Sequence, residues 1–339
     1  MKGFLLATFL FFVGLAIAAA IIVVVGGDEI QLAASRFAGI FLLPIAAMLV
    51  IEAILSTWRW NIILSAQGDS IPFKKLLPVW MAGNAFNYLS PIVFMGGEGL
   101  RIFMLKKRFD IAYHRGGASV VVDQLFNGIS VVAIVVAGAG VLAWYVSVPG
   151  TATALIVVAA IFGPAFAALA FLFIQSFRNK QTFTPILKAL SLHRTRFGLF
   201  VARIESEMLS FLSLSSRAFW LVVAVSVARQ LALVARAMFV LAALGVSVAW
   251  ADGLLALSGV FVSYALPIPL ALGTQEAAQT ALFGLLGWGV GTGILFSALY
   301  RATELTLVFG GVAVLARSFT EFAASNIFKA IGFGGGEEA

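Results

Sequence analysis

The chain has 339 residues, of which 62% are hydrophobic and only 11% are charged, and its mean hydropathy is +1.06. These values exclude a soluble globular domain and indicate a protein whose solvent is the lipid bilayer. The net charge of +7 therefore reflects membrane topology and not nucleic-acid binding, and the absence of cysteine excludes disulfides and thiolate metal sites.

Apolar runs of about 20 residues, the length that crosses a bilayer, predict six membrane-spanning helices. The first run resembles a secretory signal because Lys2 precedes it, but it is too long, so we expect an anchored helix. The sequence predicts an all-α membrane protein with a single polytopic domain over 1–339. In chain order the predicted spans are 4–25, 37–58, 117–145, 152–175, 217–247 and 289–316.

Two further apolar segments, 76–108 and 250–287, are interrupted by glycine and proline. Each is long enough to enter the bilayer, turn and leave on the same side, which predicts a re-entrant hairpin. Broken helices persist in a bilayer only where protein or a wet cavity satisfies their backbone groups. The predicted hinge residues are Pro91, Gly96, Gly97, Pro267, Pro269 and Gly273.

The two interruptions match each other. A shift of 178 residues places Glu98 opposite Glu276 and Asp123 opposite Arg301. Paired interruptions in two halves of a chain indicate a transporter's binding site, so we predict an inverted-topology repeat. The first repeat covers 37–175, the second covers 217–316, and a basic connection at 176–216 joins them.

Lysine and arginine collect in cytoplasmic loops, which orients the predicted spans. Arg59, the run 106–108 and the connection 176–216 fall on one side, whereas the opposite loops hold Asp28 and Asp252. We expect the inner membrane of a bacterium, with both termini in the cytoplasm and the two hairpins opening from opposite sides. The connection itself reads either as amphipathic helix on the anionic inner leaflet or as a solvated linker.

Ionisable side chains within the membrane are costly and mark functional sites by default. Arg229 and Arg236 lie seven residues apart on one face of a predicted span that contains no acid. A guanidinium group binds phosphate bidentately, so these residues suit a lipid head group, with Glu52 as the competing protein partner for one of them. The predicted substrate-binding residues are Arg229, Arg236, Arg301, Arg101, Asn87 and Gln275.

Acidic residues accompany these arginines. Glu98 and Glu276 follow the two interruptions, where each either gates the site or caps the helix that begins there. Arg301 pairs either with Glu304 in its own helix or, across the pseudo-symmetry axis, with a repeat-related acid such as Asp123, Glu98 or Glu276. The predicted gating or proton-coupling residues are Glu98, Glu276, Asp123, Glu304 and Glu52.

Other chemistry has little support in the sequence. His114 and His193 are the only imidazoles, and both fall in basic connecting segments. No Walker-type phosphate loop is present, so direct coupling to ATP is not predicted. We expect no metal and no other cofactor.

At these residues the chain resembles a known family, the transmembrane, flippase-like domain of lysylphosphatidylglycerol synthases, which also occurs as a stand-alone protein. The resemblance covers roughly 40–316. It depends on Asn87-x3-Pro91-x4-Gly96-Gly97-Glu98-x2-Arg101-x3-Leu105 and on Pro267-x-Pro269-x3-Gly273-x2-Glu276 followed by Arg301.

The resemblance implies a domain that moves a lipid between leaflets, while a separate cytoplasmic domain attaches the amino acid. The printed sequence holds no such catalytic domain, so aminoacyl transfer is not implied and we expect a protein that is not an enzyme. Asp123 is followed by Gln124, where the family often has arginine. The stretches 121–124 and 87–89 are similar to the branch associated with hopanoid biosynthesis.

The sequence therefore predicts a flippase or transporter for a lipid with a polar or anionic head group. One alternative is an integral-membrane transferase acting on a lipid-linked substrate, with Glu98 or Asp123 as base. Another is a non-catalytic partner of lipid-biosynthesis enzymes. The expected partners are membrane lipids, either phospholipids or polycyclic and polyprenyl lipids, and further copies of the chain, but not nucleic acid.

Overall fold

The computed structural model describes residues 2–89, 96–145, 181–212, 216–246, 248–266 and 268–330, with a few single residues between 163 and 178. Within these ranges the regular secondary structure is helical throughout, which confirms the predicted all-α fold. The predicted hinges Pro91 and Pro267 lie outside the described residues, as does most of the predicted span 152–175.

The helices follow the predicted order along the chain. The helix α3 with the short η1 before it, α6, α10 and α13 are each long and apolar enough to cross a membrane. The helices α1 and α2 meet at an angle of 84° and together would make a fifth span. The bounds are α1 Lys2–Val25, α2 Gly27–Ser35, η1 Gly39–Phe41, α3 Leu42–Ala66, α4 Phe73–Leu89, α5 Gly97–Phe109, α6 Tyr113–Tyr145, α8 Phe183–Ala189, α9 Arg196–Phe211, α10 Arg217–Ala243, α11 Trp250–Ser263, η2 Pro269–Ala271, α12 Thr274–Leu285 and α13 Val290–Ala330.

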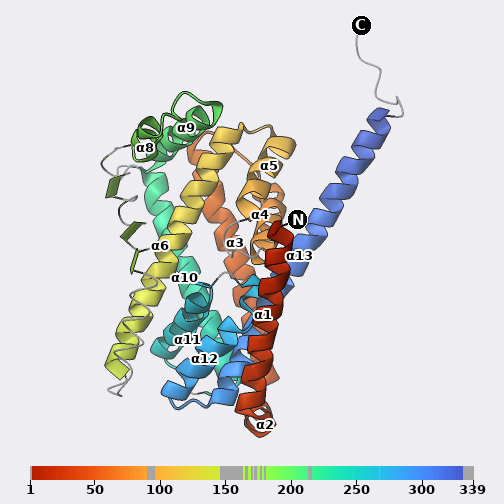
Figure 1. The fold of residues 1–339 in the computed structure, drawn as a ribbon, viewed down its shortest axis with the longest axis vertical. Helices are drawn as coiled ribbons and strands as arrows, with labels where there is room; N and C mark the ends of the chain where they lie inside the picture. The colour runs from red at the N-terminus through yellow and green to blue at the C-terminus, as the bar shows by residue number, and fades with distance from the viewer. Residues whose placement is uncertain are drawn as a thin grey trace.

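Each of the two segments predicted as a hairpin contains a pair of short helices, while re-entry into the bilayer and the inverted repeat stay predictions. The first pair is α4 and α5, with 17 and 13 residues, and the second is α11 and α12, with 14 and 12 residues. Most of these helices are too short to cross about 30 Å of hydrocarbon at 1.5 Å per residue. The two pairs lie toward opposite ends of the bundle (Figure 1).

Long helices hold the two hairpins in place. In the bundle α3 packs along α10, α4 packs against α13, and α11 packs against α6. Each hairpin has its own apolar core: Trp60, Leu76 and Leu105 belong to the first, and Leu241 and Phe283 belong to the second. These five side chains are fully buried, so two dry cores flank the middle of the molecule.

The first hairpin is closed by glycine. A Cβ atom on Gly97 would collide with the backbone carbonyl of Gly83, so α4 and α5 touch backbone to backbone at this point. The second hairpin turns through left-handed backbone: Gly273 has φ 75°, and Leu270 and Ala271 have φ 60° and 48°. Non-glycine residues in this region carry strain of about 1 kcal/mol or more each, which neighbouring contacts must offset.

The second predicted span ends later than the sequence indicated. Helix α3 continues to Ala66, and Arg59 lies inside it with only 3% of its surface exposed. The prediction that the span ends at 58 and that Arg59 occupies a loop is wrong. Trp60 and Ile63 are fully buried and continue the apolar face of the helix past the charge.

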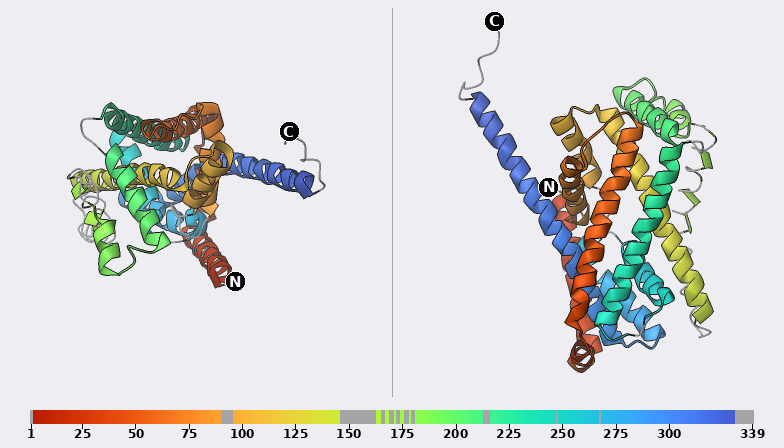
Figure 2. Two further views of the ribbon diagram at one scale, coloured as in Figure 1. Left: turned by 90° about the horizontal axis from the view of Figure 1, so that it is seen from above. Right: turned by 180° about the vertical axis from the view of Figure 1, so that it is seen from behind.

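The connection between the two halves contains the short helices α8 and α9. They lie at the end of the bundle where α5 ends, and α2 lies at the other end (Figures 1 and 2). Exposed apolar side chains of this region, such as Ile186 and Phe197, stand beside exposed basic ones, such as Lys188 and Arg196. The connection is thus helical over α8 and α9, and its contact with the inner leaflet stays a prediction.

Candidate functional site

A polar cavity of about 130 Å³ lies inside the bundle, and residues of both hairpins line it. Seven helices contribute to its wall, and most of its polar groups are charged residues or amides. The lining residues are Glu52, Ser56, Arg59, Trp80, Asn84, Asn87, Tyr88, Arg101, Asp123, Gln124, Asn127, Val131, Arg229, Leu233, Arg236, Phe261, Tyr264, Tyr300, Glu304 and Leu307.

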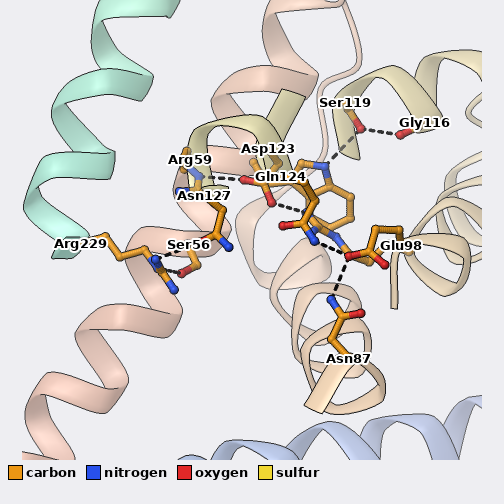
Figure 3. A network of polar contacts seen from close by, with 12 residues as sticks. Ser56, Arg59, Asn87, Glu98, Gly116, Ser119, Asp123, Gln124, Asn127 and Arg229 are labelled. Atoms are coloured by element: carbon orange, nitrogen blue, oxygen red, sulfur yellow. Dashed lines mark hydrogen bonds and ion pairs between the residues drawn. The ribbon is translucent and has the colours of Figure 1, made fainter. Parts of the chain in front are cut away.

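One carboxylate organises the first-hairpin side of the cavity. Asp123 of α6 accepts a hydrogen bond from Arg59 Nε at 2.8 Å on one oxygen and from Arg101 Nη2 at 2.9 Å on the other (Figure 3). All three side chains are at most 5% exposed. Asp123 therefore joins α3, α5 and α6, and the trio carries one net positive charge.

Arg101 is held by an aromatic ring as well as by Asp123. Its guanidinium carbon lies 3.8 Å from the ring centroid of Trp60, a cation–π contact. The indole of Trp60 donates to Ser119 at 3.2 Å. Within the described residues, Arg59 Nη1 and Arg101 Nε have no hydrogen-bond acceptor although both are buried. Two donors at this side of the cavity are thus unsatisfied.

Arg229 has only neutral partners. Its Nε donates to Ser56 at 2.8 Å and its Nη1 donates to Asn127 at 3.2 Å (Figure 3). No carboxylate of the described residues lies within ion-pair distance of it. Arg229 therefore lacks an anionic partner, as the sequence predicted. A guanidinium group inside the membrane without such a partner is costly.

Arg236, unlike Arg229, has acidic partners. Its Nε lies 2.9 Å from Glu52, and its Nη2 lies 3.6 Å from Glu304. It also donates to Thr303 at 2.8 Å and to the hydroxyl of Tyr300 at 2.6 Å. Glu52, named as a competing partner from the sequence, takes this arginine.

Glu98 caps the returning helix of the first hairpin. Its carboxylate accepts the backbone N–H of Gly96 at 2.7 Å, the amide of Asn87 at 3.0 Å and the amide of Gln124. Asn87 also accepts the N–H of Gly97 at 2.6 Å. Of the two readings left open, the structure has Glu98 in the capping position, tied to α4 and α6.

Glu276 caps the returning helix of the second hairpin in the same way. Its carboxylate accepts the backbone N–H of Gly273 at 2.8 Å and forms an ion pair with Arg301 of α13. Arg301 also donates to the carbonyls of Leu270 at 3.2 Å and Ala271 at 3.1 Å, the two residues in left-handed backbone. Arg301 therefore pairs with a hairpin acid, one of the two alternatives that the sequence allowed.

The remaining predicted residues lie near the second hairpin. Glu304 lines the cavity and accepts the hydroxyl of Tyr264 at 2.8 Å. Gln275 is fully buried, its Oε1 lies 3.5 Å from Arg301, and neither residue belongs to the cavity wall. Among the residues that the structure describes, no three His, Asp or Glu side chains form a group able to hold a metal ion.

Sequence reasoning named Glu52 of α3 but missed Ser56 and Arg59 as cavity residues of the same helix. Glu52, Ser56 and Arg59 follow the i, i+4, i+7 spacing that places polar side chains on one face of a helix. This stripe would have identified α3 as a cavity helix if the apolar run had been followed past Arg59. Tyr300 was missed because an aromatic residue in a span reads as core.

Comparison with known proteins now bears on this arrangement. Residues 11–311 match the family described as the lysylphosphatidylglycerol synthase TM region. The chain belongs to this family. A UPF0104 membrane protein of Methanothermobacter thermautotrophicus (strain ATCC 29096 / DSM 1053 / JCM 10044 / NBRC 100330 / Delta H) is 30% identical over 112 residues, which is 33% of each chain.

The family match confirms the resemblance found from the two hairpin motifs, and it covers both hairpins and the cavity between them. The matched segment spans only a third of the curated relative's length, so nothing about that whole protein is carried over. The similarity to the hopanoid-associated branch stays a prediction, because neither comparison addresses it.

Proposed function

We propose that this family member moves a lipid with a polar or anionic head group between the leaflets of its membrane. The observation that carries the proposal is Arg229: a guanidinium group without a carboxylate partner, in a polar cavity between two half-helix hairpins. An irregular backbone around a polar cavity in an apolar bundle is the architecture of membrane transporters.

The charges of the cavity favour an anion. Its first-hairpin side holds three guanidinium groups, those of Arg59, Arg101 and Arg229, around the single carboxylate of Asp123. The unsatisfied N–H groups of Arg59 and Arg101 belong to the same side. A phosphate oxygen would accept from such donors and offset part of the positive charge.

The size of the cavity limits what enters it. Sites for drug-sized ligands are about 300–1,000 Å³, so about 130 Å³ suits a head group and excludes a whole lipid. In this proposal the head group crosses through the cavity while the hydrocarbon part stays among apolar surfaces. Arg301 and Gln275, which lie outside the wall, would hold the second hairpin and not the head group.

The proposal extends to the setting of the protein. We place it in the inner membrane of a bacterium with both termini in the cytoplasm, and we assign it no chemical reaction. Membrane lipids are its partners. No observation favours the transferase or the assembly partner over transport. The experiment below distinguishes the three functions.

The test uses purified protein in phosphatidylcholine vesicles that contain a trace of fluorescent phosphatidylglycerol. Dithionite, which does not cross the membrane, reports how fast the labelled lipid changes leaflet. The wild-type protein should accelerate exchange, and R229A should abolish the acceleration. R203A is the matched control, because Arg203 is exposed on α9, far from the cavity wall.

The outcomes separate the candidate functions. Lipid movement by R229A at the wild-type rate would overturn the assignment of the head-group site. A new lipid species in the extracts would favour the transferase, whereas neither movement nor chemistry would favour the assembly partner. Fluorescent phosphatidylcholine serves as a second probe, since a cavity selective for anions should move it more slowly.

A further inference from the structure

A second cavity, of about 170 Å³, lies beside the polar one between α6, α11 and α12. Its wall is apolar apart from one hydroxyl, that of Ser258, which is satisfied because it donates to the carbonyl of Leu255 at 2.7 Å. The wall of the cavity therefore offers a ligand no free side-chain hydrogen-bond donor. Its surface suits a hydrocarbon.

Small side chains create this apolar groove. Gly138 and Ala139 of α6, Gly259 of α11, and Ala278 and Ala281 of α12 all line it. The three helices pack tightly around it, since a Cβ atom on Gly138 would collide with Ser258. The small side chains thus leave a groove between helices that are otherwise closely packed.

The apolar groove continues the polar cavity along the same two helices. On α6, Val131 lines the polar cavity and Val135, one turn later, lines the groove. On α11, Phe261 lines the polar cavity and its neighbour Val262 lines the groove. A ligand with a polar end and an apolar end would fit the polar cavity and the adjoining apolar groove.

The dimensions agree with that reading. Asn127, which binds Arg229, precedes Gly138 by 11 residues, and this separation is about 16 Å along a helix. The groove is lined over two turns of each of its three helices, such as 135–142 of α6. Its volume of about 170 Å³ is spread along these two turns, about 11 Å of helix, which suits a single acyl chain better than fused rings. Leu285, at the end of the lined part of α12, is 41% exposed, so the groove opens outward there.

We propose that the groove binds an acyl chain of the lipid whose head group enters the polar cavity. This inference rests on the proposed function and adds to it the chemical class of the cargo, an acyl lipid. Its head group contacts Arg229, and one chain leaves the cavity past Val131 and lies between α6, α11 and α12.

The test is photolabelling in nanodiscs that contain phosphatidylglycerol with a diazirine in one acyl chain, followed by mass spectrometry of the labelled peptides. Label should concentrate in the peptides that contain 135–142 and 278–285. A281F places a ring in the groove and should reduce this label several-fold. The control is A277F, which adds the same ring to the exposed neighbouring position of α12 outside the groove.

A second pair of variants keeps the test decisive if A281F fails to fold. A139F fills the same groove from α6, and A137F adds a ring at an exposed position of that helix that does not line the groove. Label that A281F and A139F leave unchanged would overturn the inference. So would stronger labelling of these peptides by a photoreactive sterol, which would assign the groove to fused rings.

The failure of this inference is distinguishable from failure of the proposed function. If the wild-type protein moves fluorescent phosphatidylglycerol but its groove takes up no label, the acyl-chain site is wrong while transport stands. If the groove is labelled and A281F removes the label, but the wild-type protein moves no lipid, the chain site stands and the transport proposal is wrong.

Discussion

Asp123 and Arg301 lie 178 residues apart, at positions that correspond when the two hairpin motifs are aligned, and they have the same structural role although their charges are opposite. Each lies on the long helix that follows a hairpin and forms an ion pair with the returning helix of that hairpin: Asp123 with Arg101, and Arg301 with Glu276. Each hairpin is thus tied to the helix after it by one buried charge pair. Residues of both hairpins line the cavity.

The Arg301–Glu276 pair should stabilise the second hairpin. R301M leaves the buried carboxylate of Glu276 without its cation and frees the strained carbonyls of Leu270 and Ala271, so we expect a loss of about 3–5 kcal/mol. E276Q should cost less, because its amide oxygen still accepts the N–H of Gly273. The measurement is unfolding of the purified variants in mixed micelles by denaturant.

A double-mutant cycle isolates the pair itself. The variant with both R301M and E276Q should be more stable than the sum of the single changes by about 0.5–3 kcal/mol, because no buried charge is left alone. Additive losses would mean that Arg301 acts only through the two carbonyls. R203A, at an exposed arginine of α9, should leave stability unchanged within about 0.5 kcal/mol.

The contact between Gly97 and Gly83 should tolerate no methyl group. G97A forces α4 and α5 apart, and we expect a loss of about 1–3 kcal/mol together with disturbance of Arg101, which packs over Gly83. The control is G99A on the same helix, where an added Cβ meets nothing within 4 Å. It should stabilise the protein by about 0.4–1 kcal/mol through helix propensity. Equal effects of the two changes would contradict the close-packed turn.

The sequence predicted the hairpins because their signals are local. Glycine and proline interrupt apolar runs at fixed distances from Glu98 and Glu276, and an apolar run must break where its backbone leaves the helix. Those interruptions correctly located α4–α5 and α11–α12. The end of α3 was predicted too early, because a charged residue inside a helix looks like the end of an apolar run. The apolar face of α3 in fact continues past Arg59.

The pairings could not be predicted in the same way. Which acid neutralises Arg236 depends on the contact of α10 with α3, and which one neutralises Arg301 depends on the position of the second hairpin against α13. Both are tertiary relationships between segments far apart in the chain. Arg229 and Arg236 look alike in the sequence, and only their neighbours distinguish the paired arginine from the unpaired one.

Glu205 should hold the helices of the connection together. Its carboxylate on α9 is 1% exposed and accepts the backbone N–H groups of Thr182, Phe183 and Thr184 at the start of α8, as well as the hydroxyl of Thr184. E205Q halves the acceptors and removes the charge, so α8 should be destabilised by about 1.5–3 kcal/mol. Hydrogen exchange of amides 182–190 measures this directly.

The control for E205Q is E207Q on the same helix, since Glu207 forms no ion pair with any residue that the structure describes. It should leave exchange in α8 unchanged. Faster exchange throughout the protein in E205Q, and not in α8 alone, would contradict a local role and mean that the connection stabilises the whole bundle.

The orientation in the membrane can be tested without a background signal, because the chain has no cysteine. Single cysteines replace Asp28 on α2 and Lys188 on α8, two exposed positions at opposite ends of the bundle. In whole bacteria a membrane-impermeant maleimide should label D28C at once, and K188C only after the membrane is opened, because basic segments stay in the cytoplasm. The reverse pattern would invert the proposed orientation. Labelling of both positions from outside would contradict the prediction that α8 and α9 lie on the cytoplasmic side and contact the inner leaflet.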